Sequence, residues 1–466
     1  MSNGVIFLFL VLILSSSSFA FAVENEIGAS IRLRQEILDN FIYLGTTRAA
    51  ADDRSYFRLR IQLWDNVKFN KEISLYARLA TEPRYHVAGP YRVTLDNERN
   101  LKRLDQDEIF IDNLYLDFKK PFDLPVNLRI GRQDFLGKDM YGEGFIIFDG
   151  TPADGSRSFY VNAVKLQLII VENHTIDFVY ISNPRTDIYL PSLHPSVYDT
   201  EKETSRLYIN HKKRLTASHE QGFLIYGRNK LSQKLMLEPY YLYKTEDQWA
   251  TNPQLNFHTF GMRAVLKINE EWSLRGELAR QIGKYSDGRG KTGIGGYVFL
   301  TKAFPQIKLS PKIEIGFVYL SGDNRNTGKD EAWNPPFSRG AFTNELFAYI
   351  VIPETVLKGG PIPGYWTNLR EIVTKLSLNL SKNANLCFSY QHLWSDKKTN
   401  FTATPLNQMF SNDGYDRGHM LTFLGIYQFT KNVDGLLQFE YFIPEDFYTS
   451  KAKNATFIRW QIQYKL

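Results

Sequence analysis

The feature that most constrains this chain is the length of its connections, which alternate between long and short from one end to the other. The segments between them repeat apolar and polar residues every two positions, a period typical of strands. A soluble propeller or sandwich also has many short strands, but it gives no reason for the alternation in loop length. The expected long connections lie near 39–54, 83–108, 134–158, 183–220, 245–256, 282–292, 320–366, 395–416 and 443–456, and the expected short ones near 70–71, 119–126, 171–174, 229–233, 267–270, 302–309, 381–385 and 429–434.

These connections imply eighteen strands, with both ends of the strand series on the side of the short turns. An even strand number, short turns on one side and long loops on the other are typical of bacterial outer-membrane barrels. We therefore predict an all-β fold, a transmembrane antiparallel β-barrel of about 18 strands with short periplasmic turns and long extracellular loops.

The segments themselves fit such a wall. Within 57–63, apolar residues alternate with Arg58, Arg60 and Gln62, and the segment 458–466 alternates in the same way. One face of each strand therefore suits hydrocarbon and the other suits water. Aromatic residues make up 14% of the chain, which fits the girdles at the two membrane interfaces.

The first 22 residues are predicted to be a signal peptide. An apolar run over 5–14 is followed by Ala20-Phe21-Ala22, an A-x-A site with cleavage expected before Val23. The alternative is a membrane anchor, but about ten apolar residues are too few to span a bilayer. The expected domains are thus 1–22, a signal peptide, and 23–466, the barrel. The single cysteine, Cys387, has no internal disulfide partner and is expected to face either lipid or lumen.

One stretch carries a resemblance to a known family. Gly131-Arg132-Gln133, followed by the motif over 149–159 (DGTPADGSRSF), resembles the signature of the alginate export family of outer-membrane barrels. The stretches 277–281, 316–323 and 444–448 are similar to further pieces of that family.

The resemblance implies a monomeric pore in the outer membrane of a Gram-negative-type bacterium. It implies partners as well: an anionic polysaccharide, outer-membrane lipid, and periplasmic and inner-membrane proteins of polysaccharide synthesis and export. Arg132 and Arg157 belong to the motif and are expected to form a constriction or to anchor a loop. Arg132 shares strand parity with Ile130, so either the strand bulges there or this side chain lies above the membrane. The connections 83–108 and 134–158 are the expected lids.

Strand parity also predicts a set of cationic side chains that face the lumen. Rings of arginine and lysine in a pore select anions, and the planar guanidinium fork binds a carboxylate in a bidentate manner. The alternative is that these cations pair with inward Glu36, Asp117, Glu238 and Glu277 and only brace the wall. With the two motif arginines, the expected substrate path comprises Arg32, Arg34, Arg58, Arg60, Arg78, Arg129, Arg132, Arg157, Lys165, Arg263, Arg275 and Arg459.

Other chemistries lack a motif. No histidine spacing matches a metal site, no G-x-S-x-G elbow occurs, and no basic block suggests nucleic acid. We expect no cofactor, no metal and no enzymatic activity, although a barrel hydrolase is an open alternative. The sequence thus predicts a pore for an alginate-like polyuronate. The alternative function is a general or uptake porin for small anionic solutes.

Overall fold

The computed structural model describes residues 24–46, 53–88, 92–93, 101–102, 104–105, 109–148, 160–194, 208–209, 216, 218–248, 252–324, 326–338, 342–356 and 366–466. The expected signal peptide and the whole motif over 149–159, Arg157 included, lie outside these residues.

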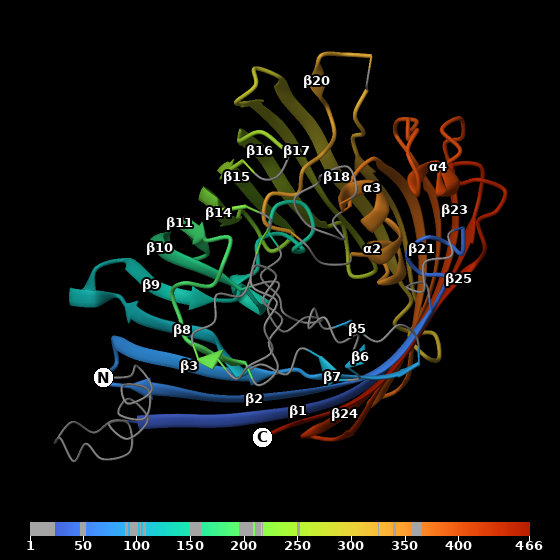
Figure 1. Cartoon of the computed structure of the whole chain (residues 1–466). Helices are drawn as coiled ribbons and strands as arrows, with labels where there is room; N and C mark the ends of the chain where they lie inside the picture. Colours follow the sequence, from blue (N-terminus) through green and yellow to red (C-terminus); the bar gives the residue numbers. More distant parts are fainter. Residues whose placement is uncertain are drawn as a thin grey trace.

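A closed antiparallel barrel forms the wall of the protein (Figure 1). Each wall strand pairs with the wall strands before and after it in the chain, and the last pairs with the first, Lys465 opposite Ser30. Closure removes the free edges, so every wall strand has two hydrogen-bonding neighbours. The eighteen wall strands among the described residues are β1 (Glu24–Asp39), β2 (Arg54–Lys68), β3 (Ile73–Thr81), β8 (Ile109–Lys119), β9 (Val126–Gln133), β10 (Val161–Val171), β11 (His174–Asn183), β14 (Glu220–Lys230), β15 (Leu235–Glu246), β16 (Leu255–Lys267), β17 (Trp272–Tyr285), β18 (Gly290–Ala303), β19 (Lys312–Leu320), β21 (Leu369–Ser381), β22 (Ala384–Trp394), β23 (Asp416–Thr430), β24 (Val433–Pro444) and β25 (Ala455–Lys465).

The two faces of the wall have opposite character, as strand alternation requires. In β1, Arg32 and Arg34 are buried on the inner face, whereas Ile31 and Leu33 are 48% and 39% exposed on the outer face. Apolar side chains are exposed in the same way around the whole barrel and form its lipid-facing belt. No helix in the described part of the chain is long and apolar enough to cross a membrane.

The connections follow the predicted alternation with one exception. The expected long connection at 282–292 is wrong: β17 and β18 extend as a hairpin, and only residues 286–289 connect them. The alternation in the sequence breaks at the glycines around 288–296, but backbone pairing continues through them because a glycine keeps its ladder hydrogen bonds. The short-side connection between β18 and β19 is longer than this turn.

The remaining elements lie in the connections. They are β4 (Arg84–Ala88), β5 (Arg92–Val93), β6 (Leu101–Lys102), β7 (Leu104–Asp105), η1 (Pro121–Asp123), η2 (Gly137–Asp139), β12 (Ser192–His194), β13 (Tyr208–Ile209), β20 (Lys329–Asp330), α2 (Leu346–Ile350), α3 (Ile352–Val356) and α4 (Leu406–Met409).

Two connecting segments fold into the barrel and build an apolar core there. We call residues 134–148 the first inner segment, and the described residues 333–338 and 342–356 the second inner segment; the second carries α2 and α3 (Figure 1). Residues of both join inward-facing wall residues in one buried cluster. The rings of Phe145 and Phe342 stack with centroids 4.2 Å apart, and the amide of Phe337 donates to the carbonyl of Ile147 at 2.9 Å. The expected lid at 134–158 is therefore joined by a segment of the connection 321–368, which the sequence did not single out.

Candidate functional site

Below the two inner segments, the lumen keeps a cavity of about 740 Å³. It extends from Trp64 and Lys465, near the short turns, to the tip of the second inner segment at residues 342–345. Strands from both ends of the chain supply most of its wall, because β1 pairs with both β2 and β25. The cationic side chains of the described lining are Arg32, Arg34, Arg60, Arg78, Lys375, Arg459 and Lys465, and Glu345 is its acidic side chain.

A cluster of arginines on β1 and β2 forms one side of this cavity. The register places Arg32 opposite Arg60 and Arg34 opposite Arg58. Like charges that face each other across a strand pair are destabilising. Two carboxylates, Glu36 and Glu82, offset this repulsion.

Glu36 and Glu82 bridge this arginine cluster. Glu36 contacts Arg34 at 3.1 Å, Arg58 at 3.2 Å and Arg459 at 2.9 Å, and Glu82 contacts Arg32 at 2.6 Å and Arg58 at 3.0 Å. Both carboxylates are fully buried. Each of these two carboxylates therefore forms ion pairs with more than one guanidinium.

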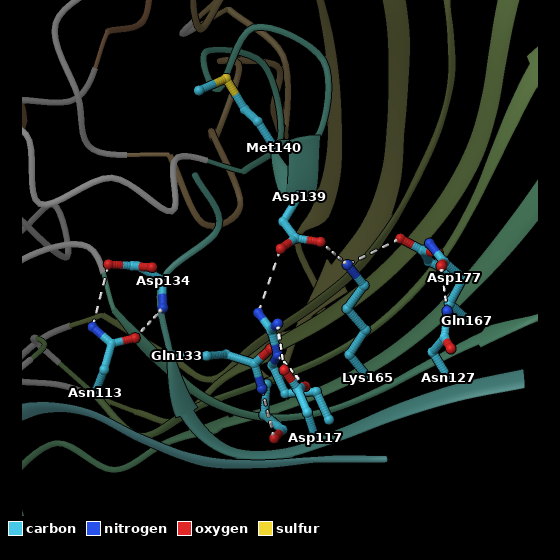
Figure 2. A network of polar contacts seen from close by, with 12 residues as sticks. Asn113, Asp117, Asn127, Gln133, Asp134, Asp139, Met140, Lys165, Gln167 and Asp177 are labelled. Carbon is cyan, nitrogen blue, oxygen red and sulfur yellow. Dashed lines mark hydrogen bonds and ion pairs between the residues drawn. The ribbon is translucent and has the colours of Figure 1, made fainter. Parts of the chain in front are cut away.

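A second group of cations holds the first inner segment against the wall (Figure 2). Asp134 accepts from Arg78 at 2.6 Å. Asp139 accepts from Lys165 at 2.7 Å and from Arg129 at 3.4 Å. These contacts come from β3, β9 and β10, so the segment is tied to three separate strands.

The same segment is tied further around the wall. Glu143 contacts Arg275 at 2.6 Å and Arg263 at 3.5 Å, and Arg228 donates to the carbonyl of Met140 at 2.9 Å. An ion pair inside a low-dielectric wall is costly to break by removing one partner, since the other charge is then left without compensation. The inner segment is therefore attached by charge as well as by apolar packing.

In the attachment of the second inner segment, the roles are reversed. Here the carboxylates belong to the wall, and the hydrogen-bond donors belong to the segment. Glu440 of β24 accepts from the amides of Glu345 and Leu346 at 2.9 and 2.6 Å, and Thr343 donates to Glu371 of β21 at 2.7 Å. The Glu345 carboxylate contacts Arg459 at 3.1 Å. The tip of this segment is therefore fixed directly above the cavity.

The structure places most of the predicted cations on the inner face, but in two groups. Arg32, Arg34, Arg60, Arg78 and Arg459 line the cavity. Arg58 lies behind them, paired with Glu36 and Glu82. Four others hold the first inner segment: Arg129, Lys165, Arg263 and Arg275.

Arg132 has a different environment from this inner set. β9 pairs in register with both neighbours through Arg132, so the strand does not bulge there. Its side chain keeps the parity of outward-facing Ile130, and Asp187 of the following long connection covers it with hydrogen bonds of 3.1 and 2.6 Å. These hydrogen bonds join β9 to that connection. Gly131 has a φ of +136°, and a Cβ there would lie 2.2 Å from the carbonyl oxygen of Leu114, so the position requires glycine.

Sequence reasoning missed three charged residues of the described cavity lining: Lys375, Lys465 and Glu345. The two lysines have inward parity on β21 and β25, so strand parity could have found them. Glu345 precedes a short helix in a long connection, and no periodic pattern marks it. Cys387, which was expected to face either lipid or lumen, lines the cavity.

We expect the attachment of the first inner segment to weaken only in acid. Burial raises the pKa of Asp139, but the charge and hydrogen bond of Lys165, with the charges of Arg129 and Arg228, outweigh it and hold the pKa below its ordinary value of 3.8. A lowered pKa stabilises the attached state above the ordinary pKa, and that stabilisation is lost as pH falls through the lowered one. Single-channel recordings should show steady current from about pH 8 to about pH 5 and new opening noise below about pH 4.

The Asp139→Asn variant is the control for this pH effect. It should show a noisier current at neutral pH and less change on acidification, because the titrating group is gone. A wild-type current that stays steady in acid would contradict this role of Asp139.

A closed barrel of this size with a polar wall face inside and an apolar outer belt has the architecture of an outer-membrane pore. The family described as "Alginate export" matches residues 208–460, which is more than half of the chain. The chain belongs to the alginate export family, and it is an outer-membrane protein of a Gram-negative-type bacterium. The matched range begins after the motif at 131–159, so the later strands carry the family match.

Solved porins share the fold. OpdQ of Pseudomonas aeruginosa superposes with a TM-score of 0.54 at 10% identity, covering 95% of this chain and 97% of that one. OccK5 (OpdH) and OccK7 (OpdD) of the same organism each give 0.52, at 11% and 10% identity, covering 95% and 96% of this chain and 98% and 99% of theirs. At such identities the likeness concerns the fold alone. No curated protein matches the chain.

Proposed function

We propose that this pore carries an alginate-like polyuronate from the periplasm to the exterior. The observation that supports it is the lining of the lumen cavity, where seven cationic side chains accompany one carboxylate among the described residues. A ring of cations beside a water-filled path concentrates anions. Membership of the alginate export family supports the polymer as the substrate.

The cavity cations suit uronate groups in particular. A guanidinium binds a carboxylate through two parallel hydrogen bonds. Arg34 and Arg459 already hold the carboxylate of Glu36, so a uronate would exchange with an existing partner rather than fill an empty site. Exchange keeps each contact weak, which allows a chain to slide.

The predicted substrate path then has two parts. The cavity arginines and Arg58 form its periplasmic half. Arg129, Lys165, Arg263 and Arg275 contribute once the first inner segment moves, because they now hold its carboxylates. Cavity-lining Arg78 holds a carboxylate of that segment as well. Arg132 and Arg157 are proposed to support the outer loops. A monomer that receives the polymer from periplasmic and inner-membrane export proteins fits this scheme, and so does removal of residues 1–22 on export.

The second candidate is a porin for small anionic solutes. The specific observation in its favour is the contact between the two inner segments above the cavity, through stacked Phe145 and Phe342. In this conformation the cavity suits a short anionic ligand better than a long polymer. The two candidates differ in whether the inner segments have to separate.

Conductance in planar bilayers tests the proposal. Polymannuronate added to the periplasmic side should block the anion current, and longer chains should block at lower uronate concentration because more residues bind at once. Arg60→Gln should weaken this block, while Lys308→Gln, on a short turn away from the cavity, should not. Equal block by monomeric glucuronate and by polymer would favour the small-solute porin. No block by either would refute both.

A further inference from the structure

The outer surface carries a cationic group just above the lipid-facing belt, at the extracellular ends of β21, β22 and β23. It consists of Arg370, Asp396, Lys397, Lys398 and Tyr415, and we call it the outer-rim patch. Arg370 and Lys397 both contact Asp396, at 2.5 and 3.7 Å. Asp396 is 2% exposed, whereas the two cations are 47% and 41% exposed. The carboxylate is thus buried, and the two cations that contact it are exposed.

The position of the patch follows from the strand register. Arg370 has the parity of Ile372, which is 43% exposed, and Tyr390 and Leu421 are exposed to a similar degree on the neighbouring strands. Two residues of strand separate Arg370 from Ile372, or roughly 7 Å. The patch therefore lies directly outside the apolar belt, at the depth of the headgroups of the outer leaflet.

Within the outer-rim patch itself, three cations accompany one carboxylate. Asp396 also accepts from the amide of Gly322 at 3.0 Å, which keeps it in place. Asp416, which follows Tyr415 in the chain, contacts His392 at 2.9 Å. The nitrogen of Lys398 lies 5.2 Å from the ring of Tyr415, which is 47% exposed. Two cations thus cover one buried carboxylate, and a third cation lies beside an exposed aromatic ring.

We propose that the outer-rim patch binds the phosphate of a phosphorylated glycolipid in the outer leaflet. Arg370 already donates to Asp396 through Nε and Nη2, and its remaining N–H groups are available to phosphate oxygens. Lys397 and Lys398 supply point charges beside it. Tyr415 offers a flat face to a sugar ring, and the adjoining apolar belt contacts the acyl chains. The site lies on the outside of the wall and is independent of what passes through the lumen.

Native mass spectrometry of the full-length protein in detergent tests this site. Bis-phosphorylated lipid A should bind the wild type, and the triple variant Arg370→Gln, Lys397→Gln, Lys398→Gln should bind it at least about tenfold more weakly, because charge-assisted hydrogen bonds are lost. Lipid A without phosphates should bind wild type and variant equally. Excess inorganic phosphate should not displace the glycolipid, since it lacks the acyl contacts.

A matched control removes three exposed lysines from the short-turn side, as Lys308→Gln, Lys382→Gln, Lys431→Gln. This variant should bind lipid A like the wild type, and heat-modifiable migration on gels should show that both variants are folded. Equal loss in both variants would reduce the effect to overall charge and overturn the site. Full binding by the patch variant, or displacement by inorganic phosphate, would overturn it as well.

Discussion

Removing the second inner segment should raise the single-channel conductance several-fold. Replacing residues 333–356 by a short Gly-Ser linker takes away α2, α3 and buried aromatic residues such as Phe337 and Phe347 that fill the outer half of the lumen. A barrel of about 18 strands leaves an aqueous channel when nothing fills it. The wall keeps its own hydrogen-bonded neighbours without the segment, so it should remain folded. Conductance in planar bilayers at symmetrical salt measures the change.

A milder variant and a control accompany this deletion. Glu440→Gln weakens the acceptor of the amides of Glu345 and Leu346, and it should give a fluctuating current between the two conductance levels. Shortening the short-side turn over 304–311 changes the chain length without touching the lumen and should leave conductance unchanged. A deletion variant that conducts like the wild type would show that another part of the chain closes the pore.

Neutralising the cavity should abolish its preference for anions. The described lining has a formal charge of +6, and the triple variant Arg60→Gln, Lys375→Glu, Lys465→Glu leaves +1. Since permeant ions respond to the charges that line a narrow path, the chloride-to-potassium permeability ratio should fall close to unity. The reversal potential under a potassium chloride gradient measures this ratio.

The control for this experiment makes the same change in total charge at positions outside the cavity. Lys308→Gln, Lys382→Glu, Lys431→Glu changes the total charge equally on the exposed short turns, and it should keep the anion preference because bulk salt screens those sites. An unchanged ratio in the cavity variant would show that this cavity does not lie on the ion path. In that case the arginines of β1 and β2 only brace the wall.

The wall strands are the part of the structure that local sequence predicts best. In β1 and β2, Arg32 and Arg58 alternate with apolar residues, and the structure buries the arginines and exposes the apolar neighbours. Parity is a local property, because successive side chains in a strand must point to opposite faces. The same rule explains the failure at 282–292, where glycines hide the alternation although the backbone continues to pair.

The contents of the lumen were not predictable in the same way. Glu143 meets Arg275, and Phe145 meets Phe342, across more than a hundred residues of chain. No periodicity marks either inner segment, because neither is a regular strand or a long helix. Arg132 on the outer face likewise depends on Asp187, which lies in a connection 55 residues further along the chain.

The sequence by itself therefore determined the wall: its strand number, its closure into a barrel, its two faces and its location in an outer membrane. Those properties follow from a two-residue period and from loop lengths, which each segment carries locally. Only the tertiary structure decided which inward cations line a cavity and which hold a segment in place. An arginine has the same parity in either role, and the carboxylate that it meets, such as Glu36 or Glu143, is supplied by distant chain.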